Sequence, residues 1–342
     1  MHIRQLSIYV ARKANEIVII LLYVDDIVIA STTFTILMEI KQSFCNKYEM
    51  KDLGTLERYL GMHINTTKDY ISIDQSEYTV QLLKKYQSYL TSKRHRNTPM
   101  DTTLHVSKDE QMTEKQQYFC NIFPYQNIIG GLLYLAIHTR PDIAFAVNTL
   151  SRFNNSPTYT ACHAVIRVLE YLRDNTHYAI KYNSKDLNFH MYSDSGWAAN
   201  VDNRRSTCGH VVYMGNGPIS WQSKLQTVVA TSSMEAEYMG AYYAVQDCCW
   251  IKGVMNELGF NSNDPTPFYL DSKSAIDLAK NPIYHKRSKH IHIKYHWLRQ
   301  KVEDKTVTLN HIKTDKMIAD IFTKPLAYAE FAKHRDSLIH KI

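Results

Sequence analysis

The pattern of apolar and polar positions divides the chain into three parts. The first part contains β-rich runs, and the longest of them is interrupted by Asp25 and Asp26. These runs form two pairs along the chain, and each pair is followed by a segment with helical periodicity. The pattern therefore predicts a hairpin (6–11 and 16–30), a helix (34–44), a second hairpin (59–64 and 70–73) and an amphipathic helix (75–89).

The second part begins with a polar stretch and continues with helices. Residues 91–120 carry a basic run and Pro99 but few apolar clusters, which is typical of a linker or loop. The pattern from Tyr125 to Tyr178 is helical. Pro141 stands at a plausible helix start and Pro157 after a helix end.

The third part begins at Leu187, where short strands replace the helical pattern. The predicted order is three strands (189–192, 209–214 and 219–222), a long helix (234–258), a strand (267–270), two helices (272–279 and 290–301), a strand (306–312) and a last helix (316–322). Glycines at 215 and 217 mark the turn between the second and third strands. This order predicts one compact, mixed α/β domain of about 140 residues.

Four acidic residues stand near the ends of these predicted elements. Asp194 ends the first strand, Glu237 lies in the first turns of the long helix, Asp271 ends the fourth strand, and Asp320 lies in the last helix. Hydrolysis of a phosphodiester needs an aligned water and positive charge on the attacking and leaving oxygens, and two Mg²⁺ ions about 3.5–4 Å apart supply both. Mg²⁺ prefers oxygen ligands, including carboxylates. The four acids are therefore candidate metal ligands and catalytic residues.

Any one of these acids alone is typical of a solvated surface carboxylate, a turn residue or a helix cap. The motifs around them change that interpretation, because residues 193–326 resemble the ribonuclease H domain of copia-type retrotransposon Pol polyproteins. The matching motifs are SDSGWA (193–198), RRST (204–207), ISW (219–221), EAEY (235–238) and ADIFTKPL (319–326). The resemblance favours Glu237, which has Gly240 three positions later, over Glu235, which we interpret as a capping acid at the helix start.

The first part of the chain resembles the polymerase of the same family. The motif YVDD (23–26) resembles the catalytic hairpin of reverse transcriptases, and MKDLG (50–54), YLG (59–61), TPMD (98–101) and TRPDIA (139–144) also match. Asp25 and Asp26 are the candidate polymerase carboxylates. The family's third metal-binding Asp and its fingers lie upstream of these motifs and are not included here, so we do not expect polymerisation by this chain alone.

The resemblance implies a fold of α/β and α+β type. A partial polymerase palm with a helical thumb or connection is followed by a ribonuclease H-like, mixed five-stranded α/β domain. The predicted boundaries are a palm (1–90), a linker (91–124), a thumb or connection (125–185), the ribonuclease H-like domain (186–326) and a tail (327–342).

Charge and composition favour a nucleic-acid partner without proving one. Lys and Arg outnumber Asp and Glu by 7 among 342 residues, a mild basic excess. Basic clusters in the nuclease part are expected to contact phosphates of a hybrid duplex; they contain Arg204, Arg205, Lys286, Arg287 and Lys289. The six cysteines form no CxxC pair and are interpreted as reduced thiols.

The sequence predicts an intracellular protein, either cytoplasmic within a virus-like particle or nuclear, without secretion or a membrane span. The predicted function is a metal-dependent ribonuclease H that uses two Mg²⁺ ions, or Mn²⁺ in their place, to cut the RNA strand of RNA–DNA hybrids. No small-molecule substrate is expected, apart from nucleotides for a complete polymerase. The alternative is a non-catalytic, nucleic-acid-binding remnant of a decayed or domesticated retrotransposon.

Overall fold

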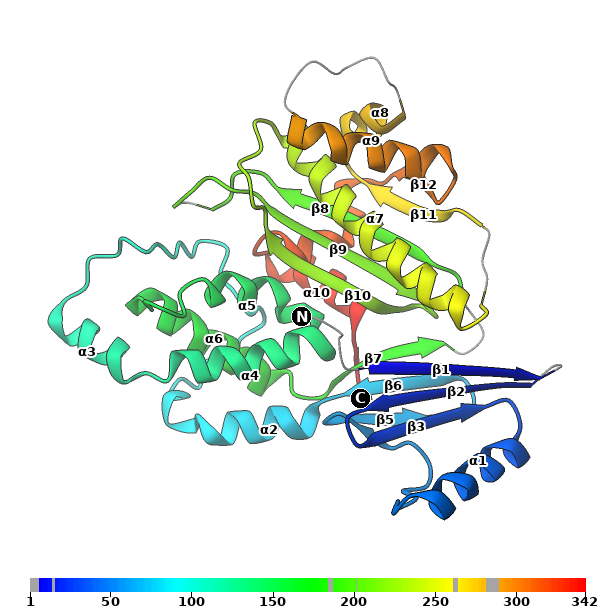
Figure 1. Cartoon of the computed structure of the whole chain (residues 1–342). Helices are drawn as coiled ribbons and strands as arrows, with labels where there is room; N and C mark the ends of the chain where they lie inside the picture. Colours follow the sequence, from blue (N-terminus) through cyan, green and yellow to red (C-terminus); the bar gives the residue numbers. More distant parts are fainter. Residues whose placement is uncertain (1–5, 14–15, 184–186, 201, 261–263, 281–288) are drawn as a thin grey trace. The chain divides into compact units, whose positions relative to one another are not determined.

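The computed structural model describes residues 6–13, 16–183, 187–200, 202–260, 264–280 and 289–342 (Figure 1). The chain forms two compact units. One comprises residues 1–59 and 249–263, and the other comprises residues 60–248 and 264–342. None of the described helices is both long enough and apolar enough to cross a membrane.

The first unit contains a three-stranded antiparallel sheet in the order β1-β2-β3, followed by α1. The strands are β1 (Leu6–Lys13), β2 (Glu16–Tyr23) and β3 (Asp26–Ser31), and the helix is α1 (Phe34–Lys47). Tyr23 pairs with Asp26, so Val24 and Asp25 form the turn. The pairing of β1 with β2 confirms the predicted hairpin, whereas the predicted run 16–30 is divided at this turn into two strands, and both aspartates are exposed there. The first of the unit's two segments ends with the short strand β4 (Arg58–Tyr59).

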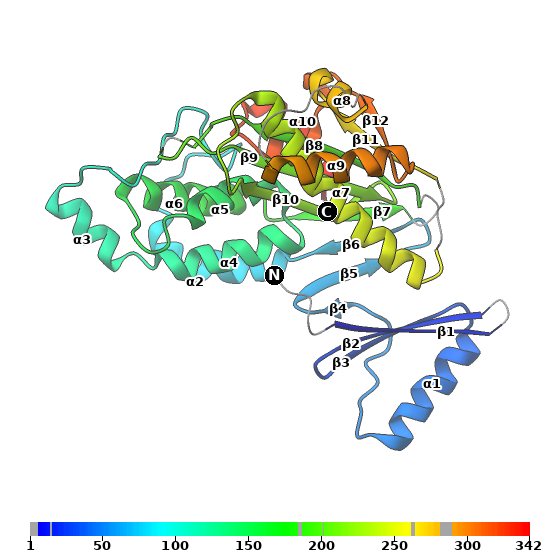
Figure 2. The ribbon, with the colours of Figure 1, turned by 45° about the horizontal axis from the view of Figure 1, so that its top comes forward.

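The second unit begins with strands and a group of helices (Figure 2). β5 (Met62–Thr66) pairs with β6 (Tyr70–Asp74), which confirms the second predicted hairpin. The following helices are α2 (Ser76–Lys85), η1 (Gln87–Tyr89), α3 (Glu114–Ile122), α4 (Tyr125–His138), η2 (Pro141–Ile143), α5 (Ala144–Ser151) and α6 (Tyr159–Asp174). Buried apolar side chains of α4, α5 and α6 form much of the core.

A buried ion pair holds these helices together. Arg140 donates two hydrogen bonds to the carboxylate of Asp142, at 2.9 and 2.8 Å, and a third to the carbonyl oxygen of Asn175 at 2.8 Å. The hydroxyl of Tyr171 donates to Asp142 at 2.7 Å. Because a buried charge is costly unless it is paired and hydrogen-bonded, these contacts explain how Arg140 and Asp142 are both accommodated in the core.

The rest of the second unit is built on a five-stranded sheet in the order β10-β9-β8-β11-β12. β8 (His190–Gly196), β9 (Thr207–Met214) and β10 (Gly217–Leu225) are antiparallel, whereas β11 (Thr266–Leu270) and β12 (Val307–His311) run parallel to β8. Figure 1 shows residues 233–248 of α7 (Ser233–Glu257), the part of that helix that belongs to this unit, in front of the antiparallel strands and α10 (Tyr328–Leu338) behind them. The remaining helices are α8 (Lys273–Lys280), α9 (Lys289–Glu303), η3 (Thr314–Lys316) and η4 (Ile318–Phe322). This topology confirms the predicted mixed α/β domain.

Residues 316–322 are the exception, because they form 3₁₀ turns instead of the predicted last helix. The reason is the close approach of η4 to β9. A Cβ atom added at Gly209 would lie 2.5 Å from Cβ of Phe322 and 3.1 Å from the carbonyl oxygen of Ala319. The backbone of η4 therefore lies directly on the sheet, with Ala319 and Phe322 buried.

The compact packing also differs from the predicted domain boundaries. β7 (Tyr178–Asn183), which was predicted as part of a helical region, pairs with β6 on one side and with β13 (His340–Lys341) on the other. The predicted tail, 327–342, thus contributes α10 and a strand, with Phe331 and Leu338 buried. The predicted linker, 91–124, includes α3 and buries Met100 and Cys120 in the core.

Candidate active site

Two of the four acidic residues come from neighbouring parallel strands. In the pairing of β11 with β8, Phe268 lies beside Met191 and Tyr269 beside Tyr192. Two residues further along both strands, this register brings Asp271 level with Asp194. Side chains two residues apart point to the same face of a strand, so both carboxylates meet at the same edge of the sheet.

The third acid, Glu237, reaches these two from the first turns of α7. A Cβ atom added at Gly240 would lie only 2.5 Å from Oγ of Ser195, so the helix packs directly on β8 at this point. This contact explains the small residue three positions after Glu237. One ligand oxygen from each of Asp194, Glu237 and Asp271 lies within 4.8 Å of the other two.

The fourth acid, Asp320, lies beside Asp194 and is not part of that group of three. Its Oδ2 atom forms an ion pair of 2.8 Å with Nζ of Lys324, four residues later in the chain. Burial raises the pKa of Asp320 to about 7, and the carboxylate of Asp194 contributes to the increase. Asp320 can therefore gain or lose a proton close to neutral pH.

The carboxylates are crowded and largely buried. Burial raises the pKa of Glu237 well above its ordinary value, and the charges of Asp194 and Asp271 raise it further. Burial and Asp194 also raise the pKa of Asp271. For Lys324, burial opposes the positive charge, but the surrounding carboxylates outweigh it and raise its pKa.

This environment fits a divalent cation with oxygen ligands. Oε2 of Glu237 and Oδ1 of Asp320 are buried and have no hydrogen-bond partner among the described residues. Unpaired buried carboxylate oxygens are costly, and a metal ion would satisfy them and offset the mutual repulsion. A set made only of carboxylates matches the hard cations Mg²⁺ and Mn²⁺ better than zinc, which favours His and Cys.

Sequence reasoning did not single out three neighbouring side chains. The hydroxyl of Thr323 donates to Oδ2 of Asp194, and that of Thr314 donates to Oδ2 of Asp271 at 3.0 Å. Lys324 and Thr323 belong to the motif around Asp320, so the motif could have pointed to them. Nothing in the sequence pattern distinguishes Thr314.

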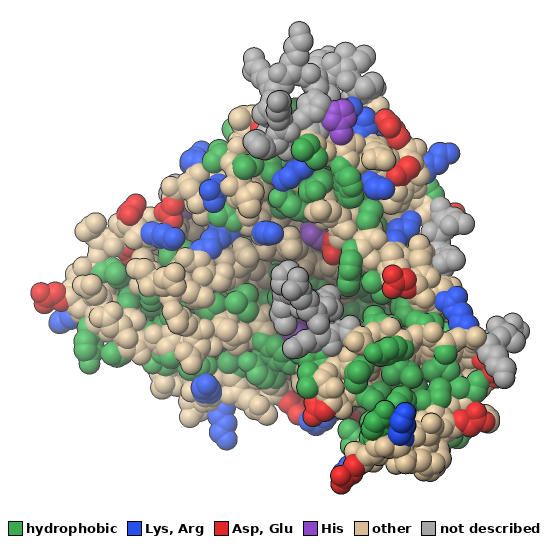
Figure 3. Space-filling view, in the orientation of Figure 1, with side chains coloured by type: hydrophobic (Ala, Val, Ile, Leu, Met, Phe, Trp, Pro, Cys, Tyr) green, Lys and Arg blue, Asp and Glu red, His purple; other side chains and the backbone are tan. Residues whose placement is uncertain are grey.

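The other predicted residues are placed as follows. Arg204 and Arg205 lie in the loop between β8 and β9, with Arg204 exposed. Lys286 and Arg287 lie outside the described residues, as does the side chain of Lys289. On the face shown in Figure 3, Lys and Arg side chains occur in small scattered groups and form no continuous basic patch.

The predicted capping role of Glu235 is confirmed by its contacts. Its carboxylate accepts hydrogen bonds from the backbone N–H of Thr231, at 2.6 Å, and from the Thr231 hydroxyl at 2.5 Å. Its own N–H donates to Oγ of Ser232 at 3.2 Å. These contacts stabilise the first turn of α7 and leave Glu237 as the acid that faces the sheet edge.

The sequence is similar to known reverse transcriptase and transposon sequences. A family model described as reverse transcriptase (RNA-dependent DNA polymerase) matches residues 2–102. The retrovirus-related Pol polyprotein from transposon TNT 1-94 of Nicotiana tabacum is 36% identical over 321 residues, which is 93% of this chain and 24% of that protein.

Two solved structures also match parts of the chain. LC11-RNase H1 in complex with an RNA/DNA hybrid has 16% identity and a TM-score of 0.31, and the match covers 40% of this chain and 94% of that one. The foamy viral protease-reverse transcriptase dRH in complex with double-stranded DNA has 16% identity and a TM-score of 0.47, covering 86% of this chain and 46% of that one.

The site thus combines a five-stranded mixed sheet with three carboxylates that converge at one of its edges. The chain belongs to the family of copia-type retrotransposon Pol polyproteins. It spans about a quarter of the length of the Pol polyproteins that it matches.

Proposed function

We propose that this chain is a metal-dependent ribonuclease H that cuts the RNA strand of RNA–DNA hybrids. The observation that carries the proposal is the convergence of Asp194, Glu237 and Asp271, with ligand oxygens within 4.8 Å of one another. They come from two strands and a helix, so the fold itself assembles the cluster. An accidental surface group of acids would not be expected to be this buried.

Each residue has a definite part in this proposal. Asp194, Glu237 and Asp271 would hold two Mg²⁺ ions, with Asp320 completing the ligand set beside Asp194. When bound, the ions supply positive charge to the attacking and leaving oxygens and lower the pKa of a bound water. Thr323 and Thr314 orient the carboxylates of Asp194 and Asp271 through their hydrogen bonds.

The proposed substrate follows from the chemistry of the two strands. Only the RNA strand of a hybrid has 2′-hydroxyl groups, and these distinguish RNA from DNA. Phosphate contacts from basic side chains would position the duplex without reading its sequence. Arg204, Arg205, Lys286, Arg287 and Lys289 remain our candidates for that role.

The first test is cleavage of a labelled hybrid in Mg²⁺ by the wild type and by Asp271→Asn. The substitution keeps the shape of the side chain but removes the charge of a metal ligand. We expect the rate to fall by roughly a hundredfold or more, because the metal contributes several kcal/mol of transition-state stabilisation. Binding of the hybrid in EDTA should change little, since basic side chains provide most of the affinity.

Asp277→Asn provides the matched control, because Asp277 is an exposed carboxylate on α8 outside the cluster. It should cut the hybrid at the wild-type rate. A wild type that binds the hybrid but never cuts it, across a range of Mg²⁺ and Mn²⁺ concentrations, would support the non-catalytic binding remnant instead. Equal cleavage by wild type and Asp271→Asn would place the activity elsewhere.

The second test concerns polymerase activity, which we do not expect from this chain. Asp25 and Asp26 are exposed on the β2–β3 turn, and among the described residues no third His, Cys, Asp or Glu groups with them to hold a metal. Two carboxylates are a poor site for the two ions that templated nucleotide addition requires. The measurement is extension of a primed RNA template with Mg²⁺ and nucleotides, and extension that Asp25→Asn abolishes would contradict this expectation.

A further inference from the structure

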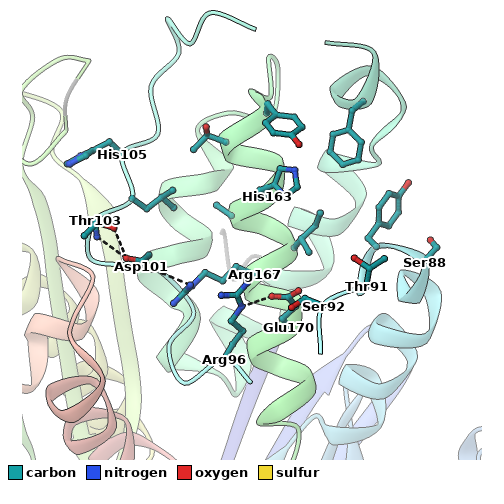
Figure 4. A pocket seen from close by; sticks show the side chains of 17 residues that line it. Ser88, Thr91, Ser92, Arg96, Asp101, Thr103, His105, His163, Arg167 and Glu170 are labelled. Atoms are coloured by element: carbon teal, nitrogen blue, oxygen red, sulfur yellow. Dashed lines mark hydrogen bonds and ion pairs between the residues drawn. The ribbon is translucent and has the colours of Figure 1, made fainter. Parts of the chain in front are cut away.

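A cavity lies in the second unit, and none of the four acidic residues lines it. It has a volume of about 700 Å³, and its walls come from η1, the segment 91–105, α3 and one face of α6 (Figure 4). The size is typical of cavities that bind small organic ligands. The segment 91–105 has no helix or strand of its own, and it contains the basic run 93–96 noted in the sequence.

The polar end of the cavity contains two arginines. Nε of Arg96 donates to Glu170 at 2.6 Å, and Arg167 contacts Asp101 at 3.3 Å and the hydroxyl of Thr98 at 3.0 Å. Among the described residues, Glu170 is the only side chain bonded to the Arg96 guanidinium, so the two terminal nitrogens of that group are available. Nε of Arg167 is buried and has no partner among the described residues. Figure 4 shows both guanidinium groups side by side at the cavity wall.

Each arginine at this end is paired with a carboxylate, Arg96 with Glu170 and Arg167 with Asp101. Burial lowers the pKa of Arg167, and the positive charges of Arg96 and Arg94 lower it further, against the opposite effects of Asp101 and Glu170. The carboxylates orient the two arginines, and among the described residues Nε of Arg167 keeps no acceptor of its own. A phosphate would accept charge-assisted hydrogen bonds from both guanidinium groups.

The other end of the cavity is aromatic. His163 stacks on Phe119 with ring centroids 5.7 Å apart at 16°, and Tyr159 meets His163 edge-on at 4.4 Å. His163 is exposed, so its ring is accessible from the cavity side. Flat rings of this kind provide stacking surfaces for a nucleobase, worth about 1–3 kcal/mol per base.

The spacing of the two ends matches one nucleotide. Tyr159, His163 and Arg167 are four residues apart along α6 and therefore share one face. Four residues correspond to about 6 Å along a helix, which is comparable to the separation between the base and the 5′-phosphate of a nucleotide. We propose that this cavity binds a single nucleotide unit, with its phosphate at Arg96 and Arg167 and its base against His163. The unit is either a free nucleoside monophosphate or one residue of a single strand.

The proposal is tested by binding measurements in EDTA, so that the carboxylate cluster cannot hold a nucleotide through a metal. The probes are adenosine 5′-monophosphate, adenosine, inorganic phosphate and a 5′-phosphorylated single-stranded oligonucleotide. The wild type should bind the monophosphate saturably and at least about tenfold more tightly than adenosine or phosphate, because only the monophosphate engages both ends of the cavity.

Two variants test the two ends separately. Arg167→Gln should weaken binding of the monophosphate about tenfold or more through loss of a charged donor. His163→Ala replaces an exposed side chain and should weaken it roughly tenfold through loss of stacking, while thermal unfolding stays at the wild-type temperature. Lys115→Gln, which removes one positive charge from the exposed side of α3 outside the cavity lining, should bind like the wild type.

The results decide between the possible ligands. If the oligonucleotide competes with the monophosphate, the cavity can bind one residue of a single strand. If only the monophosphate binds, the ligand is the free nucleotide. If inorganic phosphate binds as tightly as the monophosphate, the cavity recognises only an anion, and the proposal is overturned. The absence of saturable binding by the wild type would also overturn it, and so would wild-type affinity for the monophosphate in both cavity variants. Because no cleavage is measured, these outcomes are independent of the proposed nuclease activity.

Discussion

At the scale of single residues, the carboxylate cluster combines functional value with a cost to stability. Glu237 and Asp320 are buried beside Asp194, and each has an oxygen without a hydrogen-bond partner among the described residues. Like charges at short distance in a poorly solvated place disfavour ionisation. Repulsion between the carboxylates should therefore lower the stability of the metal-free protein most at the pH at which the proposed nuclease would be active.

The third prediction is a pH dependence of stability in EDTA. The pKa of Asp320 is about 7 in the folded chain and 3.8 as its ordinary value, so the folded state binds more protons between about pH 4 and pH 7. The free energy of unfolding should then decrease as the pH rises through this window and level off above it. We expect the melting temperature to be a few degrees higher at pH 5.5 than at pH 8, corresponding to about 1–2 kcal/mol.

Asp320→Asn cannot titrate and should flatten this dependence, although the raised pKa values of Glu237 and Asp271 leave part of it. With Mg²⁺ present the trend should reverse, because metal binding requires deprotonated ligands. A metal-free wild type whose melting temperature instead increases from pH 5.5 to pH 8 would show that other groups dominate.

At the scale of elements, the position of Glu237 depends on how closely α7 packs on β8. The fourth prediction uses two glycines of this helix. Gly240→Ala would place a Cβ atom 2.5 Å from Oγ of Ser195, whereas the same change at Gly253 meets nothing within 4 Å. We expect Gly240→Ala to reduce stability by about 1–3 kcal/mol through overpacking. It should also reduce hybrid cleavage more than tenfold, because small displacements of a catalytic group are costly.

Gly253→Ala is the matched control on the same helix. It should increase stability by about 0.5–1 kcal/mol, since alanine favours the helical conformation over glycine, and it should leave cleavage unchanged. Chemical denaturation and the hybrid cleavage assay on both variants provide the comparison. Similar effects of the two substitutions would mean that the contact with Ser195 is not what sets the helix position.

At the scale of the whole molecule, the last residues of the chain stabilise the second unit. Phe331 on α10 is 3% exposed and its ring meets that of Tyr171 at 5.7 Å, whereas Tyr328 on the same helix is 54% exposed. The fifth prediction is that Phe331→Ala reduces the free energy of unfolding by about 3–5 kcal/mol. Tyr328→Ala should change it by less than about 0.5 kcal/mol.

Denaturant unfolding of both variants measures the difference. A large effect of Phe331→Ala would confirm that residues 327–342 are part of the folded core and not a dispensable tail. A small effect, equal to that of Tyr328→Ala, would mean that α10 contributes little to the unit. The buried Arg335 also links α10 to the end of α6, because its guanidinium donates a hydrogen bond of 3.4 Å to Oδ1 of Asn175.

The sequence alone determined the order of the elements and the positions of the acids within them. Asp194 and Asp271 stand at ends of predicted strands and Glu237 near the start of a predicted helix, and the structure agrees in each case. The apolar periodicity of a strand or helix is a local property, because it can be recognised from the residues of that element alone. Family motifs then indicated which acids belong together, and why Gly240 follows Glu237.

Only the tertiary structure decided what depends on contacts between distant segments. Asp320 lies beside Asp194 on a 3₁₀ turn, Thr314 orients Asp271, β7 pairs with β6 and β13, and the polar segment 91–105 forms the wall of a cavity. The pattern of β7 was not separated from the helical run that precedes it, and a polar segment shows no period. Their positions follow from pairing and packing partners about 40 to 160 residues away, which no local pattern encodes.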